Sequence, residues 1–487
     1  METDKTYRTG LGRIKGIVRE DAISFLGIPY AKPPVGELRW KPPAAPDRWS
    51  GVYDATEYPN RAFQPPLPER LDVGEIPGEM SEDCLYLNIH RPVKRKRKRP
   101  VLVWIHGGGF VQGSANDFDP IKFALDYDVL VVAMNYRLGM LGFLDLSRFG
   151  PEYDGSAAIG FQDQILALKW IKDNISDYGG DDDNITICGG SAGGGSVLAM
   201  IAAPKAKGLF DKAIAISPSE IPLESPDVIT PYAAALKMEE EAFFEYLKSL
   251  SGEEVFKLQN DGGVGGLAAI DGTILPKTAA EAIKAGINPV PLIAGCTINE
   301  GPMLTELLGD DPNVLKFFET ALASQAGVGA PEQYLAFLDT VVPENATPAE
   351  RVDRVWFDVF RSAALRPAQA LSEVGVDAWI YSWEAPTDHP FGPTHGSDVR
   401  FVFNGFDESD DGEMQAFYKN TAANREIAAM WSQTMVNFIR NGDPNWSGIP
   451  NWPTYNAQTR ASLVVREAPS IIEDYDAEDA LAAYRLI

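Results

Sequence analysis

The chain has 487 residues, 45% of them hydrophobic, which allows one large α/β domain or two to three smaller ones. Its formal net charge of −26 repels phosphate backbones and argues against a nucleic-acid partner. No stretch reaches about 18 uninterrupted apolar residues and the first residues lack the pattern of a secretory signal, so we expect a cytoplasmic protein that does not contact a membrane.

From residue 85 onward, the sequence alternates short apolar runs with loops and helical periodicity. Residues 85–89 alternate apolar and polar side chains, as in a half-exposed strand, and this places His90 on the exposed face. Compact apolar runs predict inner strands of a mostly parallel sheet at 101–105, 129–134, 185–187, 213–217, 291–295 and 377–383. Helices are expected over 162–175 and 424–440. This alternation is typical of an α/β fold.

No linker or repeat interrupts the chain, so we expect a single domain over residues 1–487 with insertions. Residues 221–265 are rich in Glu and Ala and predict a helical cap. The basic run at 94–99 lies between two expected strands and is interpreted as a solvated hairpin tip. The three acids at 181–183 are interpreted as a loop before a strand, because they lack the spacing of a cation site. No metal site is expected.

Residues 189–193 read GGSAG and match the G-x-S-x-G pattern, after an expected strand and before an expected helix. A nucleophile on such a sharp turn adopts a strained backbone, and small neighbours allow the turn to close. The spacing does not fit a phosphate-binding loop, since no lysine follows the glycines. Ser191 is therefore a candidate nucleophile.

The sequence HGGGF at 106–110 follows the expected strand at 101–105. Successive glycines allow main-chain N–H groups to converge on the oxygen of a tetrahedral acyl intermediate. We expect Gly108, Gly109 and Ala192 to be the oxyanion donors, and His106 to anchor the loop.

A serine hydroxyl needs a base to accept its proton, and the chain has only four histidines. Where a serine on such a strand-to-helix turn has an acid and a histidine as partners, the three follow the chain order serine, acid, histidine, which favours the late loop at 387–398. His395 is the expected base, with His389 as the alternative. The expected acid is Glu300, in the loop after the strand at 291–295, with Asp271 and Asp398 as alternatives.

Taken together, these motifs resemble the type-B carboxylesterase/lipase family, whose members include cholinesterases and bacterial para-nitrobenzyl esterases. The resemblance covers nearly the whole chain. It rests on the serine motif, the late histidine loop and the segments at 25–43, 81–89, 106–110, 135–144, 161–170, 298–301 and 441–445.

The resemblance implies an α/β-hydrolase fold and an acyl-serine mechanism that needs no cofactor or metal. It assigns the nucleophile, acid and base to Ser191, Glu300 and His395, and the oxyanion hole to Gly108, Gly109 and Ala192.

The chain departs from the family pattern at several positions. Gly190 stands where the family usually carries Glu, which we expect to alter the electrostatics of the site. Ser217 matches a serine that supports the triad in the family, but Pro218 follows it in place of glycine. Cys84 stands where secreted relatives pair with an upstream cysteine. The chain has three cysteines and none upstream of Cys84, which favours free thiols in a reducing compartment.

We therefore expect a serine carboxylesterase acting on small-molecule esters. Neutral or apolar esters are favoured, since a strongly acidic protein does not gather anionic substrates. The alternatives are an amidase or carbamate hydrolase with the same triad, and a non-catalytic binding scaffold. Neither the physiological substrate nor the oligomeric state is predicted.

Overall fold

The structure, a computed structural model, describes residues 3–19, 21–66, 76–94, 98–117, 119–264, 267–326, 330–415 and 417–476. The chain forms two compact units. Unit 1 comprises Met1–Ile185, Ala203–Phe210 and Leu223–Thr278, and unit 2 comprises Thr186–Ala202, Asp211–Pro222 and Ala279–Ile487. Strand β8 (Gly180–Gly190) begins in unit 1 and ends in unit 2. The single domain expected over residues 1–487 stays a prediction.

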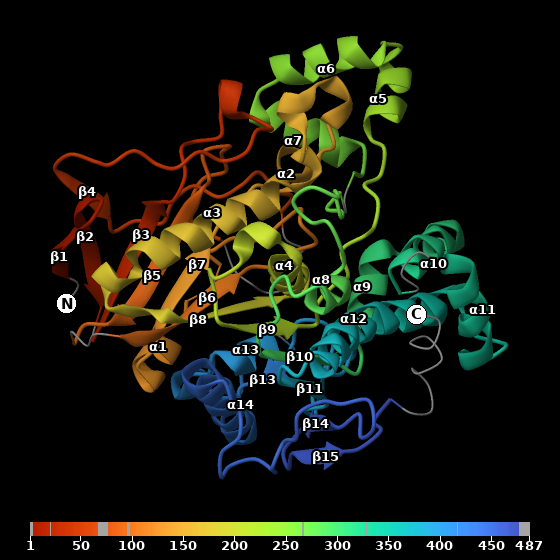
Figure 1. Ribbon diagram of the computed structural model, residues 1–487. Coiled ribbons are helices and arrows are strands. Elements are labelled where there is room, and N and C mark those ends of the chain that lie inside the picture. The colour runs from red at the N-terminus through yellow and green to blue at the C-terminus, as the bar shows by residue number, and fades with distance from the viewer. Residues whose placement is uncertain are drawn as a thin grey trace. The chain divides into compact units, whose positions relative to one another are not determined.

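Unit 1 contains a mixed sheet with the strand order β1-β2-β3-β5-β7-β6-β8 (Figure 1). The strands that pair antiparallel in this order are β1 (Thr3–Thr9), β2 (Gly12–Arg19), β3 (Ala22–Pro29), β5 (Tyr86–Pro92) and β7 (Leu130–Met134). Strand β6 (Arg99–Ile105) pairs parallel with β7, and β4 (Val52–Ala55) pairs parallel with β2. The runs predicted as buried strands at 101–105 and 129–134 are confirmed by β6 and β7, whose apolar residues are buried.

The expectation that β5 is half-exposed is wrong, because Leu87–Pro92 are all buried. His90, expected on an exposed face, is 1% exposed, and its Nδ1 lies 2.9 Å from Ser24 Oγ. Burial lowers the pKa of His90 to about 4, since the protein interior disfavours the imidazolium. Helix α1 (Ile121–Tyr127) packs against β3 and β5, and Ser24 of β3 bonds His90, so this part of β5 faces protein instead of water.

The interpretation of the basic run as a hairpin tip is also wrong. Strand β7 lies between β5 and β6, so the two strands joined by residues 93–98 are not hydrogen-bonded neighbours. Arg99 is buried at the start of β6, and its Nε donates to Asp128 Oδ1 at 2.6 Å. Residues 95–97 lie outside the described residues.

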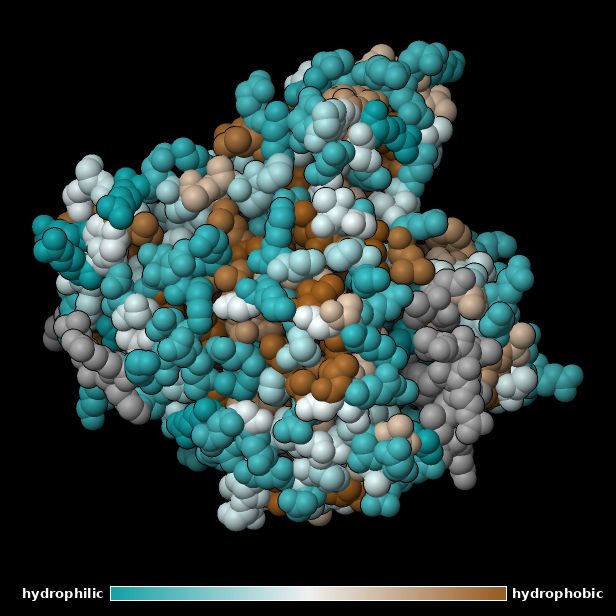
Figure 2. Space-filling view, viewed as in Figure 1, coloured by the Kyte–Doolittle hydropathy of each residue, from teal (hydrophilic) through white to brown (hydrophobic). Residues whose placement is uncertain are grey.

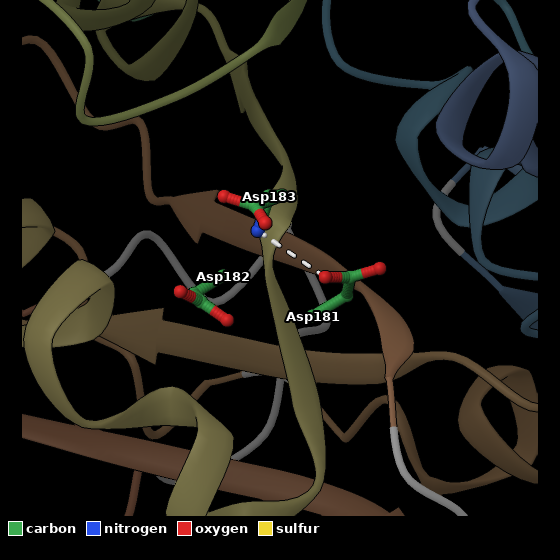
Figure 3. Close-up of side chains that lie close together, drawn as sticks. All are labelled: Asp181, Asp182 and Asp183. Atoms are coloured by element: carbon green, nitrogen blue, oxygen red, sulfur yellow. Dashed lines mark hydrogen bonds between the residues drawn. The ribbon is translucent and has the colours of Figure 1, made fainter.

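The three acids at 181–183 belong to β8, not to a loop before it as expected. One carboxylate oxygen of each lies within 4.8 Å of the others, and the backbone N–H of Asp183 donates to Asp181 Oδ1 at 3.3 Å (Figure 3). Lys98 Nζ lies 3.4 Å from Asp181 Oδ1, and Lys172 Nζ lies 3.7 Å from Asp183 Oδ1. Two lysines therefore offset part of the negative charge of this group.

Helices α1 (Ile121–Tyr127), α2 (Gly139–Phe143) and α3 (Ile159–Asn174) follow the strands of unit 1. The region expected to form a cap contains α5 (Ile229–Leu236), α6 (Glu240–Ser249) and α7 (Gly252–Asp261). Gln259 Oε1 on α7 accepts a hydrogen bond from Met140 N on α2 at 2.7 Å, and the ring of Phe244 on α6 stacks on Phe149 at 4.3 Å. These helices are thereby attached to the body of unit 1, and their role as a cap stays a prediction.

Unit 2 continues from β8 with the strand order β8-β9-β10-β11-β14-β15. Its parallel strands are β9 (Lys212–Ile216), β10 (Leu292–Thr297), β11 (Ala378–Trp383) and β14 (Ser462–Val465), and β15 (Ser470–Ile472) pairs antiparallel with β14. β9, β10 and β11 confirm the strands predicted for this part of the chain. A separate pair is formed by β12 (Met414–Gln415) and β13 (Tyr418–Lys419).

The helices of unit 2 are α4 (Ala192–Ala202), α8 (Ala279–Lys284), α9 (Gly301–Leu308), α10 (Pro312–Ala326), α11 (Pro331–Val341), α12 (Pro348–Glu373), α13 (Val399–Val402) and α14 (Ala422–Asn441). The longest, α12, begins with a capping box in which Thr347 and Glu350 exchange hydrogen bonds. Helix α14 confirms the helix predicted near 424–440.

Figure 2 shows hydrophilic residues over most of the face in view, with hydrophobic residues in scattered groups. Among the described residues, none of the helices has the length and apolar character needed to span a bilayer. Cys84, Cys188 and Cys296 are free and buried. Burial raises the pKa of each thiol well above its usual value, so all three are held as neutral thiols.

Candidate active site

Ser191 lies on the turn between β8 and α4, with a left-handed backbone at φ 59°. Its N–H donates to Ile216 O at 2.9 Å, and its carbonyl accepts from Gly195 N at 2.9 Å. A Cβ on Gly194 would lie 2.8 Å from the Cα of Pro218, so a side chain there would collide with the backbone beyond β9. The glycines around this serine therefore serve close packing, and a non-glycine residue at positive φ stores strain at the turn.

The loop after β10 is tied to the late histidine loop by backbone pairing. Asn299 and Thr394 form an isolated parallel bridge, and Asn299 N donates to Pro393 O at 3.2 Å. The side-chain Nδ2 of Asn299 also donates to Phe391 O at 3.2 Å. These bonds hold two segments that are about a hundred residues apart in the chain side by side.

At this junction Glu300 and His395 are hydrogen-bonded through Oε2 and Nδ1. Glu300 is 0% exposed, and its Oε1 accepts from Ser217 Oγ at 2.6 Å and from Thr297 N at 2.7 Å. His395 is 6% exposed. A carboxylate can only accept, so Nδ1 carries the hydrogen in the neutral ring and Nε2 presents a lone pair. Nε2 is thus the ring atom that can accept a proton.

Ser217 supplies one of these bonds in spite of the proline that follows it. Its backbone adopts φ 40°, and its N–H donates to Gly295 O at 2.7 Å, which fixes the residue beyond the end of β9. Gly190 is the last residue of β8, buried and paired with Ile216 of β9. Gly190, at the position where the family usually carries Glu, is therefore a buried residue at the end of a strand.

The alternative acids have other partners. The Asp398 carboxyl is buried, and its Oδ2 accepts from the Tyr381 hydroxyl at 2.8 Å. Burial, together with the nearby Glu300 charge, raises the pKa of Asp398 to about 7. The carboxylate of Asp271 accepts hydrogen bonds from backbone N–H groups of its own turn. Its Oδ1 lies 2.8 Å from Leu275 N.

The alternative base, His389, is only partly buried, and its Nδ1 accepts from Phe391 N at 3.3 Å. Its ring lies edge-on to Phe417. No hydrogen bond among the described residues links His389 to Glu300.

The second glycine loop, in unit 1, follows β6. Gly108 has φ 103°, and a Cβ there would lie 2.3 Å from Gln112 O, so this position requires glycine. Gly109 is also left-handed, at φ 61°. The ring of His106 stacks on Tyr136 at 4.4 Å, and burial lowers the pKa of His106 to about 4. A neutral, packed His106 suits an anchor for the loop.

Sequence reasoning missed two residues that contact the late histidine loop. The ring of Phe360, on α12, stacks on His395 with centroids 4.4 Å apart. Tyr381, on β11, bonds Asp398. Both lie in apolar stretches that signal only burial, so nothing local in the sequence distinguishes them.

Known proteins resemble this chain over nearly its whole length. A family model described as "Carboxylesterase family" matches residues 3–482. The chain is 32% identical over 498 residues to the para-nitrobenzyl esterase of Bacillus subtilis (strain 168), covering 98% of each chain. It is 34% identical to the pyrethroid hydrolase Ces2a of Mus musculus, covering 88% of this chain and 81% of the relative.

Solved structures of carboxylesterases resemble this chain as well. A PNB esterase superposes with a TM-score of 0.85 at 30% identity, covering 99% of both chains. A Geobacillus stearothermophilus carboxylesterase superposes with a TM-score of 0.83 at 31% identity, covering 98% of this chain and 99% of that one. The chain therefore belongs to the carboxylesterase family, has the α/β-hydrolase fold and is a carboxylic ester hydrolase.

Proposed function

We propose that Ser191, His395 and Glu300 are the catalytic triad of this hydrolase. The observation that carries the proposal is the buried hydrogen bond between Glu300 and His395 Nδ1, which leaves Nε2 as the accepting atom. Ser191 Oγ attacks the ester carbonyl carbon as its proton passes to His395 Nε2. The tetrahedral intermediate collapses, and the same proton goes to the leaving alcohol.

Water then attacks the acyl-serine, again giving a proton to His395 Nε2. The second tetrahedral intermediate releases the carboxylic acid, and the proton returns to Ser191 Oγ. Throughout the cycle Glu300 holds the imidazole in one tautomer and stabilises the imidazolium. Its hydrogen bonds to Ser217 and to the Thr297 amide support this orientation.

The backbone N–H groups of Gly108, Gly109 and Ala192 are the proposed oxyanion donors. The left-handed conformations of Gly108 and Gly109 support the first two. Ala192 is the first residue of α4, where N–H groups have no partner within the helix. Loss of one such donor typically costs about 3–4 kcal/mol of transition-state stabilisation.

The proposed substrates are small to medium neutral or apolar esters, in keeping with the net charge of −26. The mechanism requires no metal or cofactor. A reducing, cytoplasmic location is proposed as well, and the three free, buried cysteines support it.

The test uses para-nitrophenyl butyrate and a fluorophosphonate that reacts with activated serines. Wild type should release nitrophenolate and carry the phosphonyl group on Ser191, identified by peptide mass spectrometry. Ser191→Ala should lose both properties, and His395→Ala should lose nearly all turnover. Wild-type turnover in Ser191→Ala, or labelling of a different residue, would refute the triad.

A panel of para-nitrophenyl esters of increasing acyl length then defines the acyl preference. Matched para-nitroanilides test amide cleavage by the same triad. Faster turnover of the anilides than of the esters would contradict the proposed substrate class.

A further inference from the structure

One helix, α12, contacts His395 and the residue that follows Glu300. The ring of Phe360, which is 2% exposed, stacks on the imidazole of His395 with centroids 4.4 Å apart and planes at 27°. Two turns earlier, the helix packs against the residue that follows Glu300, because a Cβ on Gly301 would lie 2.3 Å from the Cα of Asp353. The same rigid element therefore limits the position of the acid's loop and the plane of the base.

The middle of α12 is fixed by a buried arginine next to Phe360. Arg361 is 0% exposed, and its Nε and Nη2 each donate to the Asp476 carboxylate at 2.8 Å. Its Nη1 donates to Tyr381 O on β11 at 2.8 Å, and its Nη2 also donates to Ser462 Oγ on β14 at 2.9 Å. Phe360 is thus presented to His395 from a segment bonded directly to two strands.

A second ring backs this contact. Trp356, one turn before Phe360, stacks on it with centroids 5.7 Å apart and planes at 13°. Trp356, Phe360 and His395 therefore form a series of stacked rings. A ring held in this way has little freedom to tilt, and it restricts the tilt of the imidazole beside it.

We propose that Phe360 is a positioning residue for ester hydrolysis, which holds the ring plane of His395 and favours its protonated form during proton transfer from the serine. The inference rests on the triad proposed above. The face of a phenyl ring carries negative potential and attracts a cation more strongly than a neutral ring. The contact therefore strengthens as imidazolium forms. It stabilises the transition state more than the bound substrate, so its loss should change kcat more than KM.

Among the described residues, Glu300 and Asp398 are titratable groups that interact with His395. Glu300 approaches from the β10–α9 connection, and Asp398 belongs to the same loop as His395 and is bonded by Tyr381 of β11. Phe360→Leu leaves all of these groups in place and fills most of the space of the ring. Its effect on the pH profile then reports the loss of the aromatic face.

The experiment compares full-length wild type with Phe360→Leu on para-nitrophenyl butyrate. We expect kcat to fall about tenfold, the value that a cation–π contact of moderate strength implies, while KM changes little. The acid limb of the kcat/KM profile should move to lower pH, because the protonated base is less favoured. Phe360→Tyr, which keeps the ring, should restore most of kcat and the position of the acid limb.

Phe337→Leu is the matched control. Phe337 is a buried ring on α11 that packs on Tyr334 in the core cluster shared with α10 and α12. This variant should lose thermal stability while keeping kcat and the pH profile of wild type. If Phe360→Leu does not fold, as judged by circular dichroism, Phe360→Met supplies the same comparison with a side chain closer in volume.

The rate at which a fluorophosphonate modifies Ser191 separates this inference from the proposed function. Failure of wild type to be modified at Ser191 refutes the triad itself. Modification of wild type, combined with an unchanged modification rate, kcat and pH profile in Phe360→Leu, refutes only the role of Phe360. An equal loss of kcat in Phe337→Leu also refutes it, because the effect would then come from general packing.

Discussion

Replacing Asp398 with Asn should remove a pH-dependent loss of stability from the native protein. The Asp398 carboxyl is 0% exposed, and burial raises its pKa from an ordinary value of 3.8 to about 7. The Tyr381 hydroxyl donates to Oδ2 at 2.8 Å and opposes this rise, whereas the charge of Glu300 adds to it. Asn can accept the same hydrogen bond from Tyr381 and does not ionise.

The direction follows from where the proton is bound. Between pH 3.8 and about 7 the native state keeps a proton that the unfolded chain releases, so the free energy of unfolding falls as pH rises and levels off above pH 7. A pKa difference of this size changes the free energy of unfolding by about 4 kcal/mol in total. Roughly 3 kcal/mol of this change takes place between pH 5 and pH 8.

Urea denaturation of wild type and Asp398→Asn at several pH values between 5 and 8 measures this effect. Other titrating groups are common to both proteins and cancel in the difference. We expect the variant to gain roughly 3 kcal/mol relative to wild type from pH 5 to pH 8. A difference that stays constant over this range would mean that native Asp398 is already ionised at pH 5, and the reasoning from burial would be wrong.

Three further substitutions test the site. Ser217→Ala removes the donor 2.6 Å from Glu300 Oε1 and should lower kcat about tenfold, as expected for a hydrogen bond to a charged group; an unchanged kcat on para-nitrophenyl butyrate would contradict it. Gly194→Ala places a Cβ 2.8 Å from the Cα of Pro218 and should cost about 1–3 kcal/mol of stability; a wild-type melting temperature would show that the turn can widen. Gly190→Glu adds a carboxylate beside the nucleophile and should change the pH profile of turnover, so identical profiles would dispose of that expectation.

Local sequence features were enough to predict the elements that make up the sheet. The apolar runs at 101–105, 213–217, 291–295 and 377–383 are strands because short, compact apolar runs suit the buried strands of a covered parallel sheet. The G-x-S-x-G motif likewise placed Ser191 on a strand-to-helix turn. The strained backbone of Ser191 requires small neighbouring residues, and the glycines of the motif are visible in the sequence.

One wrong expectation concerns which strands are neighbours, and another concerns which side chains are exposed. Strands β5 and β6 follow each other in the chain, and a hairpin was expected between them, but β7 lies between them in the sheet. His90, whose position in an alternating pattern suggested exposure, is buried because helix α1 packs against β5 and Ser24 of β3 bonds its ring. Strand order depends on pairing between distant segments, and alternation along one strand does not report it.

By itself, the sequence determined the type and place of most elements, the candidate nucleophile, and a short set of acids and histidines to accompany it, because these depend on residue type and local spacing. The tertiary structure alone decided that Glu300 bonds His395, that Asp398 bonds Tyr381 and that a ring from α12 lies against the imidazole. These contacts join residues on different strands, loops and helices. They arise from the packing of parallel strand ends and one anchored helix, which no local pattern encodes.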